Sequence, residues 1–155
     1  MKKYLLFLAT LSAHIAFSQS VEYQAKKEAK LAEKGPFEKI IDRELPAEIV
    51  YENDYVIAFV PLRKQAPIHF LIVPKKRIPT VNDVLEEDAE MLSHMFFAAR
   101  DIAKEFKIDQ SGYRLAINNN EDSGQSVFHI HMHILGGMKT GPMVDQTWRD
   151  SRKEE

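Results

Sequence analysis

The segment that most limits the possible folds is "VFHIHMHILGG", residues 127–137. Large apolar residues alternate in it with three histidines, and a period of two residues is typical of a β-strand. A strand would turn the apolar side chains toward one face, which the rest of the protein must cover. The other face would carry His129, His131 and His133, spaced about 6.6 to 6.8 Å apart. Three imidazoles on one face indicate a functional surface.

Four other segments have the β-branched and aromatic content of strands: "EIVYEN", "YVIAFV", "IHFLIVP" and "GYRLAINN". Short connections between several of them predict antiparallel pairing. Residues 81–106 predict one long helix capped by Asn82 or Asp83, and "PFEKIIDREL" predicts a short one. With 155 residues, the chain has room for one domain. We therefore expect an α+β domain with a five-stranded antiparallel sheet, one long helix and one short helix.

The long helix is expected to bury an apolar stripe along one side. The stripe comprises Leu85, Met91, Leu92, Met95, Phe96, Ala99, Ile102 and Phe106. His94 lies beside it and is interpreted as a structural histidine.

The first eighteen residues differ in composition from the rest of the chain. Lys2 and Lys3 precede an apolar run, and Ala16 and Ser18 then form the small-x-small pattern of a signal-peptidase site. A cytosolic helix or a short membrane anchor is the alternative, although the run is shorter than the roughly 20 apolar residues of a membrane span. We therefore expect residues 1–18 to be a cleaved export signal, with no stable membrane insertion afterwards. Residues 19–35 follow as a charged spacer or helix, 36–140 as the domain and 141–155 as a polar tail.

The overall charge limits the possible partners. The formal net charge of -2 provides no basic field for binding nucleic acid, so we expect no nucleic-acid partner. The chain has no cysteine, which excludes disulfides.

The histidines permit two kinds of site. Imidazole is a good zinc or copper ligand, but three consecutive same-face histidines span roughly 13 Å, too far to share one ion without a bend. The alternative is nucleophilic catalysis, in which one histidine attacks and its neighbours orient it. Gly124, Gln125 and Ser126 lead into the strand and supply backbone N–H groups and a hydroxyl that suit phosphate oxygens. Catalysis is the favoured interpretation, and we expect neither a metal nor a cofactor.

"GQSVFHIHMHILGG" resembles the motif of the histidine triad (HIT) family, specifically the Hint-like branch of purine nucleoside phosphoramidases. The similarity extends upstream through "FEKIIDRELPAEIVYENDYVIAF", "QAPIHFLIVPKKRI" and "GYRLAINN". It covers about residues 37–137 without large gaps. The resemblance implies a homodimer whose two sheets join into one, with a site in each protomer that binds a purine nucleotide or nucleotide conjugate.

The resemblance also implies catalytic roles for five residues. His131 would attack the α-phosphorus of a nucleoside phosphoramidate or acyl-adenylate, and water would then release the nucleotide from a nucleotidyl-histidine intermediate. His133 and His129 would orient His131, the latter through its backbone carbonyl. His69 would complete a relay to His129, and Ser126 would hydrogen-bond near the leaving group.

Further residues would bind the nucleotide according to the same resemblance. Asn118 would contact the ribose-phosphate region, and Gln125 and Ser126 would contact the phosphate and leaving group. An apolar clamp around the base would consist of Phe37, Ile40, Phe59 and Ile68. From the residues alone, a plain hydrophobic core is the favoured interpretation of each of these four, although a clamp would use the same residue types.

One position departs from the family pattern. After "AF" the family usually carries a His-Asp pair whose aspartate binds the ribose hydroxyls, whereas this chain has Val60 and Pro61. Proline has no side-chain acceptor for those hydroxyls. Export is a second departure, because the usual substrates are cytosolic. The alternative function is therefore an exported nucleotide- or metal-binding module with little catalysis.

Overall fold

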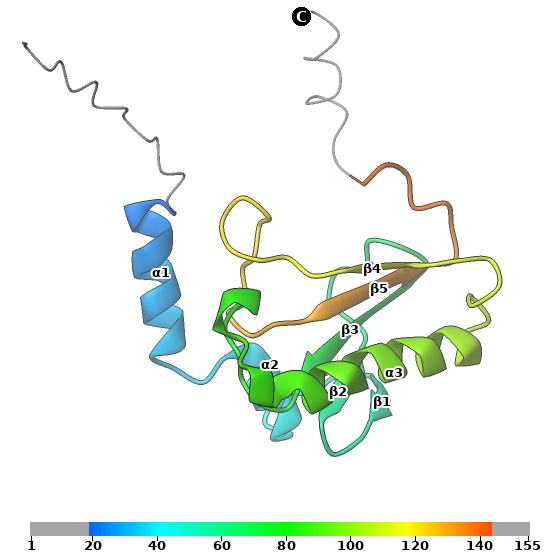
Figure 1. Cartoon of the computed structure of the whole chain (residues 1–155), viewed down its shortest axis with the longest axis horizontal. Coiled ribbons are helices and arrows are strands. Elements are labelled where there is room, and N and C mark those ends of the chain that lie inside the picture. Colours follow the sequence, from blue (N-terminus) through cyan, green and yellow to red (C-terminus); the bar gives the residue numbers. More distant parts are fainter. Residues whose placement is uncertain (1–18, 144–155) are drawn as a thin grey trace, which may run out of the picture.

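The computed structural model describes residues 19–143. The predicted signal peptide and residues 144–155 of the predicted tail lie outside this range. The expected five-stranded antiparallel sheet is confirmed, with the strand order β1-β2-β3-β5-β4 (Figure 1). Its strands are β1 (Ile49–Glu52), β2 (Val56–Phe59), β3 (Ile68–Pro74), β4 (Arg114–Ala116) and β5 (Met132–Gly136).

Alternating residues of the central strands build two separate cores. Val56, Phe70 and Ile72 point to the face covered by the long helix α3 (Ala89–Glu105), together with Met132 and Ile134 of β5. The intervening residues pack on the opposite face, against the short helix α2 (Pro36–Ile41): Ile57, Phe59, Leu71 and Val73. Both faces of the sheet are therefore covered, and the histidine side chains belong to the α2 face.

The long helix is shorter than the sequence pattern predicts. Two 3-10 turns, Val81–Asp83 and Glu86–Asp88, replace its first part, and the α-helix begins at Ala89. Neither Asn82 nor Asp83 caps the helix. Asp83 instead closes the first 3-10 turn by accepting a hydrogen bond from the Thr80 backbone at 3.0 Å. Local side-chain acceptors thus compete with helix hydrogen bonds in this stretch.

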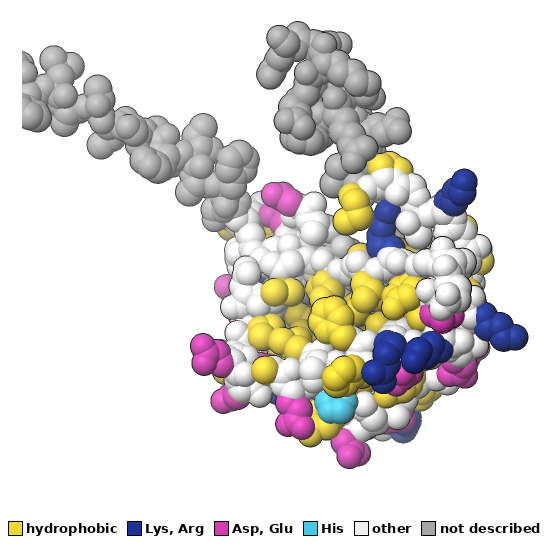
Figure 2. Space-filling view, turned by 45° about the vertical axis from the view of Figure 1, so that its right-hand side comes forward, with side chains coloured by type: hydrophobic (Ala, Val, Ile, Leu, Met, Phe, Trp, Pro, Cys, Tyr) yellow, Lys and Arg dark blue, Asp and Glu magenta, His cyan; other side chains and the backbone are white. Residues whose placement is uncertain are grey.

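The buried side of α3 also differs in part from the predicted stripe. Met91, Met95, Ala99 and Ile102 are buried as expected. Phe96 is 57% exposed, however, and Leu85, which precedes the helix, is 56% exposed. Two small buried residues, Ala98 and Ala103, lie on the sheet side instead. Figure 2 shows hydrophobic side chains gathered in the middle of one face of the molecule.

His94 has the structural role that the sequence suggested. Its ring stacks on Tyr55 with ring centroids 4.1 Å apart, and its Nδ1 lies 3.3 Å from Nδ2 of Asn53. These contacts join α3 to the turn between β1 and β2.

A third helix, α1 (Val21–Leu31), lies within the predicted spacer-or-helix segment. Ser20 caps it by accepting a hydrogen bond from the Tyr23 backbone, and none of its residues is buried. In Figure 1 it stands beside the domain, next to the loop that precedes β5. Across the described residues, the helices are too short or too polar to cross a membrane.

Candidate active site

The three histidines do not all lie in one strand, contrary to the simple alternation pattern. Strand β5 begins at Met132, so only His133 belongs to it, and His129 and His131 precede it. They are also not on an open surface, because His129 is 2% exposed and His131 is 8% exposed. Phe37 of α2 covers both, with its ring centroid 6.0 Å from that of His129 and 5.1 Å from that of His131.

The hydrogen bond of His131 determines which of its nitrogens is free. Nδ1 of His131 lies 2.8 Å from the backbone carbonyl oxygen of His129. A carbonyl oxygen only accepts, so Nδ1 carries the proton and Nε2 of the neutral ring keeps its lone pair. Burial lowers the pKa of His131 below its usual value of 6.5. The ring is therefore neutral near pH 7, with Nε2 as a nucleophile.

A chain of hydrogen bonds likewise determines the tautomer of His133. The backbone N–H of Gln65 donates to Nδ1 of His69 at 3.0 Å, which leaves the proton of neutral His69 on Nε2. That Nε2 lies 2.9 Å from Nδ1 of His133 and donates to it. Neutral His133 must then carry its own proton on Nε2. This N–H is buried and has no partner among the described residues.

The predicted relay from His69 to His129 is wrong. His69 contacts His133 because strands β3 and β5 are paired with His133 opposite Leu71, which places His69 two residues away on the same face. His129 instead donates from Nε2 to the carbonyl oxygen of Pro74 at 2.7 Å, and its buried Nδ1 has no partner within residues 19–143. Burial also lowers the pKa of His129. Desolvation, with the charges of His131 and His69, lowers the pKa of His133 to about 4.

The loop before the histidines is stabilised by hydrogen bonds of a buried side chain. Gly124 has a φ of +73°, a conformation that favours glycine, and it turns the chain toward Gln125. The Gln125 amide donates to the carbonyls of Pro79 and Val127 and accepts from the Asn120 backbone. The predicted contact between its side chain and phosphate therefore needs correction, because Gln125 is 3% exposed and its amide is already used.

The other predicted polar contacts lie at the edge of the site. Ser126 is exposed at the end of this loop. Asn118 is partly exposed, two residues beyond Ala116, which pairs with His133. Their roles in binding remain predictions.

The predicted base clamp is only partly assembled. Phe37 and Phe59 are in edge-to-face contact at 5.5 Å, and Ile40 packs against the same cluster. Ile68 packs instead against the α3 cluster, on the opposite face of the sheet from His69. Neighbouring residues of a strand point to opposite faces. Ile68 therefore does not belong with the other three.

The histidines do not form a metal site in this arrangement. Within residues 19–143, no group of three or more His, Asp or Glu side chains is placed to hold an ion. One nitrogen of each triad histidine is used in a hydrogen bond, to a backbone carbonyl for His129 and His131 and to His69 for His133. The geometry accordingly favours an oriented nucleophile.

The comparison with protein families identifies the domain. Residues 42–140 match the HIT domain family. The chain belongs to the HIT family.

Curated relatives and solved structures agree with this assignment. The HIT protein is 50% identical over 114 residues to the purine nucleoside phosphoramidase of Escherichia coli K12, which covers 74% of this chain and 96% of the relative. The structure of a HIT family hydrolase from Legionella pneumophila has a TM-score of 0.68 and 42% identity, covering 70% of this chain and 96% of the other. A HIT family hydrolase from Clostridium thermocellum gives a TM-score of 0.70 at 42% identity, covering 73% and 98%.

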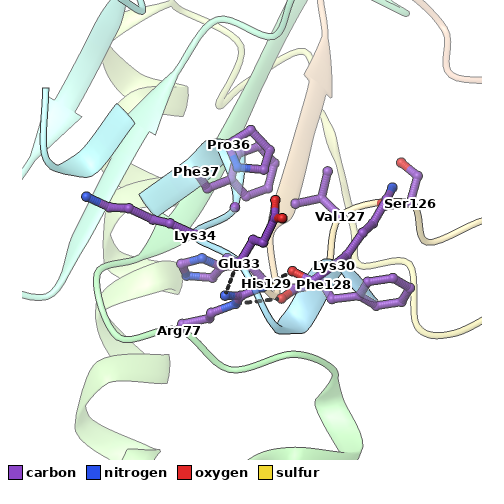
Figure 3. Close-up of a pocket in the computed structure, with 11 residues that line it drawn as sticks. Lys30, Glu33, Lys34, Pro36, Phe37, Arg77, Ser126, Val127, Phe128 and His129 are labelled. Carbon is purple, nitrogen blue, oxygen red and sulfur yellow. Dashed lines mark hydrogen bonds between the residues drawn. The ribbon is translucent and has the colours of Figure 1, made fainter. Parts of the chain in front are cut away.

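Next to the histidines, the HIT protein has a pocket of about 200 Å³ (Figure 3). Ser126, His129 and Phe37 line one part of it, and Lys30 and Glu33 line another. Lys30 belongs to α1 and Glu33 follows it, so both precede the matched HIT region. These two residues were not among the predicted site residues. The only available signal was the spacing of Tyr23, Lys27 and Lys30, which share one side of a helix.

The lowered pKa of His131 predicts how activity depends on pH. Only the neutral ring can attack, and protonation of Nε2 removes the lone pair. Because burial lowers this pKa, activity should persist as the pH falls below 6.5 and decline only at a lower pH. The measurement is the pH profile of kcat/KM for a phosphoramidate substrate. An acid limb centred at or above 6.5 would contradict a buried, neutral nucleophile.

Proposed function

We propose that this HIT protein hydrolyses nucleoside phosphoramidates or related nucleotidyl conjugates through a covalent histidine intermediate. The observation that carries the proposal is the 2.8 Å hydrogen bond from Nδ1 of His131 to the His129 carbonyl, which leaves Nε2 unprotonated. The similarity to the Escherichia coli purine nucleoside phosphoramidase supports the substrate class.

The reaction follows from this geometry in two displacements. Nε2 of His131 forms a bond to phosphorus as the bond from phosphorus to the leaving amine breaks, and the amine takes a proton from solvent. The intermediate ring is positively charged, and the His129 carbonyl accepts the hydrogen bond of its Nδ1–H. The unpaired N–H of His133 donates to a phosphate oxygen as negative charge builds there. Water then attacks phosphorus as the bond from phosphorus to Nε2 breaks, one proton of that water passes to solvent, and the nucleoside monophosphate is released with Nε2 again free.

An assay with purified protein tests the proposal. Adenosine and guanosine phosphoramidates should release the nucleoside monophosphate and the free amine in equal amounts, and a chelator should leave the rate unchanged. Binding of the nucleotide without release of amine would support the alternative of an exported nucleotide-binding module. Loss of activity with chelator, restored by stoichiometric zinc, would support a metal site.

Pro61 predicts weak recognition of the ribose. It lies two residues beyond β2, where its ring offers no acceptor to the sugar hydroxyls. We expect adenosine and 2′-deoxyadenosine phosphoramidates to differ by less than about threefold in kcat/KM, because no polar group is left unpaired by the missing hydroxyl. Pro61→Asp should introduce a preference for ribose of roughly 10- to 150-fold, equivalent to about 1.5 to 3 kcal/mol. A wild-type preference on the order of 100-fold would mean that another residue recognises the sugar.

We also propose that the protein is a homodimer with one continuous sheet. Strand β4 is at the edge of the sheet, where its outer backbone groups are open to pairing. Phe96 is 57% exposed and lies on nearly the opposite side of α3 from His94, which faces the β1–β2 turn. Leu115 of β4 is itself only partly buried. An exposed apolar side chain and an open strand edge both suit contact with a second copy of the chain.

A pair of neighbouring substitutions tests the dimer. Phe96→Glu should give a monomer in analytical ultracentrifugation at concentrations where the wild type is a dimer, because it buries a charge in the interface. Phe97→Glu is the matched control, since Phe97 is 46% exposed and contacts His94 on the other side of α3. A wild-type monomer, or a Phe96→Glu dimer, would contradict the proposal.

Export is proposed from the sequence alone, on the basic start, apolar run and small-x-small pattern of residues 1–18. N-terminal sequencing of native protein should find a start near Gln19. An intact Met1 would contradict export by signal cleavage.

A further inference from the structure

The segment that carries His129 and His131 lies outside the sheet, so other contacts must determine its shape. Strand β3 ends at Pro74 and β5 begins at Met132, and the pairing of these two strands stops short of both histidines. The carbonyl of His129 must nevertheless face Nδ1 of His131, because this bond leaves Nε2 unprotonated. Whatever holds the His129 carbonyl in place therefore also orients the nucleophile.

The peptide group that joins His129 to Ile130 is held by a backbone bond. The N–H of Ile130 donates to the carbonyl of Ile78 at 2.7 Å. This peptide is trans, so its N–H and the His129 carbonyl lie in one plane and point in opposite directions. The bond to Ile78 therefore turns the His129 carbonyl toward the His131 ring. One such bond does not by itself fix the tilt of the plane.

Arg77 holds the preceding peptide group, which joins Phe128 to His129. Its Nε donates to the Phe128 carbonyl at 3.3 Å. Because peptide groups are planar, only the two backbone dihedrals of His129 separate the plane held by Arg77 from the plane held by Ile78. With both planes held, the direction of the His129 carbonyl is determined.

Arg77 is anchored in turn by three other acceptors. Its guanidinium donates to the carbonyls of Lys30 and Glu33 at 3.0 and 2.9 Å, and it pairs with the Glu38 carboxylate at 2.9 Å. The Lys30 carbonyl belongs to the last turn of α1, where carbonyls have no partner within the helix. Figure 3 shows Arg77 below the pocket with bonds to the surrounding backbone. A planar fork with five N–H groups lets one side chain reach all four acceptors.

We propose that Arg77 is a positioning residue that keeps His131 in its reactive tautomer by holding the peptide groups around His129. The proposal rests on the hydrolase function proposed above. Two of the anchors of Arg77, the Lys30 and Glu33 carbonyls, precede residue 42, where the match to the HIT family begins. Arg77 also lines the pocket, so direct contact with the substrate is the competing role that the test must separate.

Arg77→Met tests this role, because it keeps an unbranched apolar stem and removes every donor. We expect kcat to fall about 10- to 100-fold, the cost of a misplaced reacting group, and KM to change by less than about threefold. Steady-state kinetics with an adenosine phosphoramidate measure both. An unchanged kcat would overturn the proposal. A rise in KM alone would also overturn it, because Arg77 would then act by binding the substrate.

The tautomer of His131 provides a measurement that a loss of stability alone would not change. With isotope-labelled histidine, nitrogen NMR of the wild type at neutral pH should show a protonated Nδ1 and an unprotonated Nε2 in His131. Arg77→Met should give intermediate shifts for both nitrogens, because the ring then exchanges between its two neutral forms. A variant with lowered kcat and the wild-type tautomer would overturn the proposal.

Two further variants complete the test. Arg77→Lys keeps a positive charge for Glu38 but lacks the planar fork, so its kcat should lie between those of the wild type and Arg77→Met. If Arg77→Met does not fold, Arg77→Lys serves in its place, and a wild-type kcat and tautomer in Arg77→Lys would overturn the proposal. Arg43→Met is the matched control, because Arg43 also pairs with a glutamate, Glu52 of β1. It should leave kcat and the tautomer unchanged, and a loss equal to that of Arg77→Met would overturn the specific role of Arg77.

The NMR measurement separates this proposal from the hydrolase function, because it needs no substrate. If the wild type does not hydrolyse phosphoramidates, the hydrolase function fails, and the tautomer in Arg77→Met still decides whether Arg77 orients His131. If the wild type is active and Arg77→Met keeps its kcat and tautomer, only the role of Arg77 fails.

Discussion

Replacing His131 with alanine is expected to lower kcat by at least about 10⁴-fold, the scale on which loss of a covalent nucleophile acts in other enzymes. Neither neighbouring ring can replace it: Nε2 of His133 carries a proton because its Nδ1 accepts from His69, and His129 is 2% exposed with its Nε2 bonded to the Pro74 carbonyl. The measurement is kcat under single-turnover conditions, which isolates the chemical step.

His94→Ala is the matched control for this substitution. His94 is also a histidine with aromatic neighbours, but it stacks on Tyr55 over the other core. Its replacement should change kcat by less than about threefold, with at most a modest loss of stability. Turnover by His131→Ala at the rate of the His94→Ala variant would show that His131 is not the nucleophile.

The second large effect concerns the unpaired N–H of His133. His133→Ala is expected to lower kcat by about 10²- to 10³-fold, because it removes a preorganised donor to the charge that develops on phosphate. The effect should fall on kcat with little change in KM, since the donor is needed most in the transition state. A variant that changed KM alone would mean that His133 only binds the substrate.

His69 should act through His133 as a positioning residue. It donates to Nδ1 of His133 and thereby keeps the other proton on Nε2. A double-mutant cycle tests this dependence: once His133 is alanine, His69→Ala should have little further effect on kcat. Fully additive losses would show that His69 acts independently of His133.

The sheet and its cores could be predicted from the sequence because each strand is indicated by the pattern of apolar residues within its own short segment. The alternation in residues 127–137 reflects the geometry of an extended chain, and it correctly placed Ile130, Met132 and Ile134 in the core. The start of α3 was less predictable. Asp83 and Asp88 bind nearby backbone N–H groups and form 3-10 turns where the apolar pattern favours a helix.

The residue types of the site could be predicted from the sequence, but the hydrogen bonds between those residues could not. The motif indicated His131 and its neighbours, but whether His69 bonds to His129 or to His133 depends on the register of β3 against β5. The sequence of either segment alone does not indicate this long-range register. The same applies to Arg77, which joins segments 39 to 51 residues away in the chain through bonds to Glu38 and Phe128. For α1, a charged helix without a buried residue carries no apolar pattern that would predict where it packs.

The covalent intermediate is the central claim, and peptide mapping after rapid quench tests it most directly. Protein mixed with excess adenosine phosphoramidate and quenched within one turnover should carry one nucleoside monophosphate on the peptide that contains His131. Fragmentation should place the adduct on His131 itself, and the adduct should disappear as the nucleotide is released. An adduct on another residue, or turnover that proceeds with no adduct while the substrate inverts its configuration at phosphorus, would contradict the account.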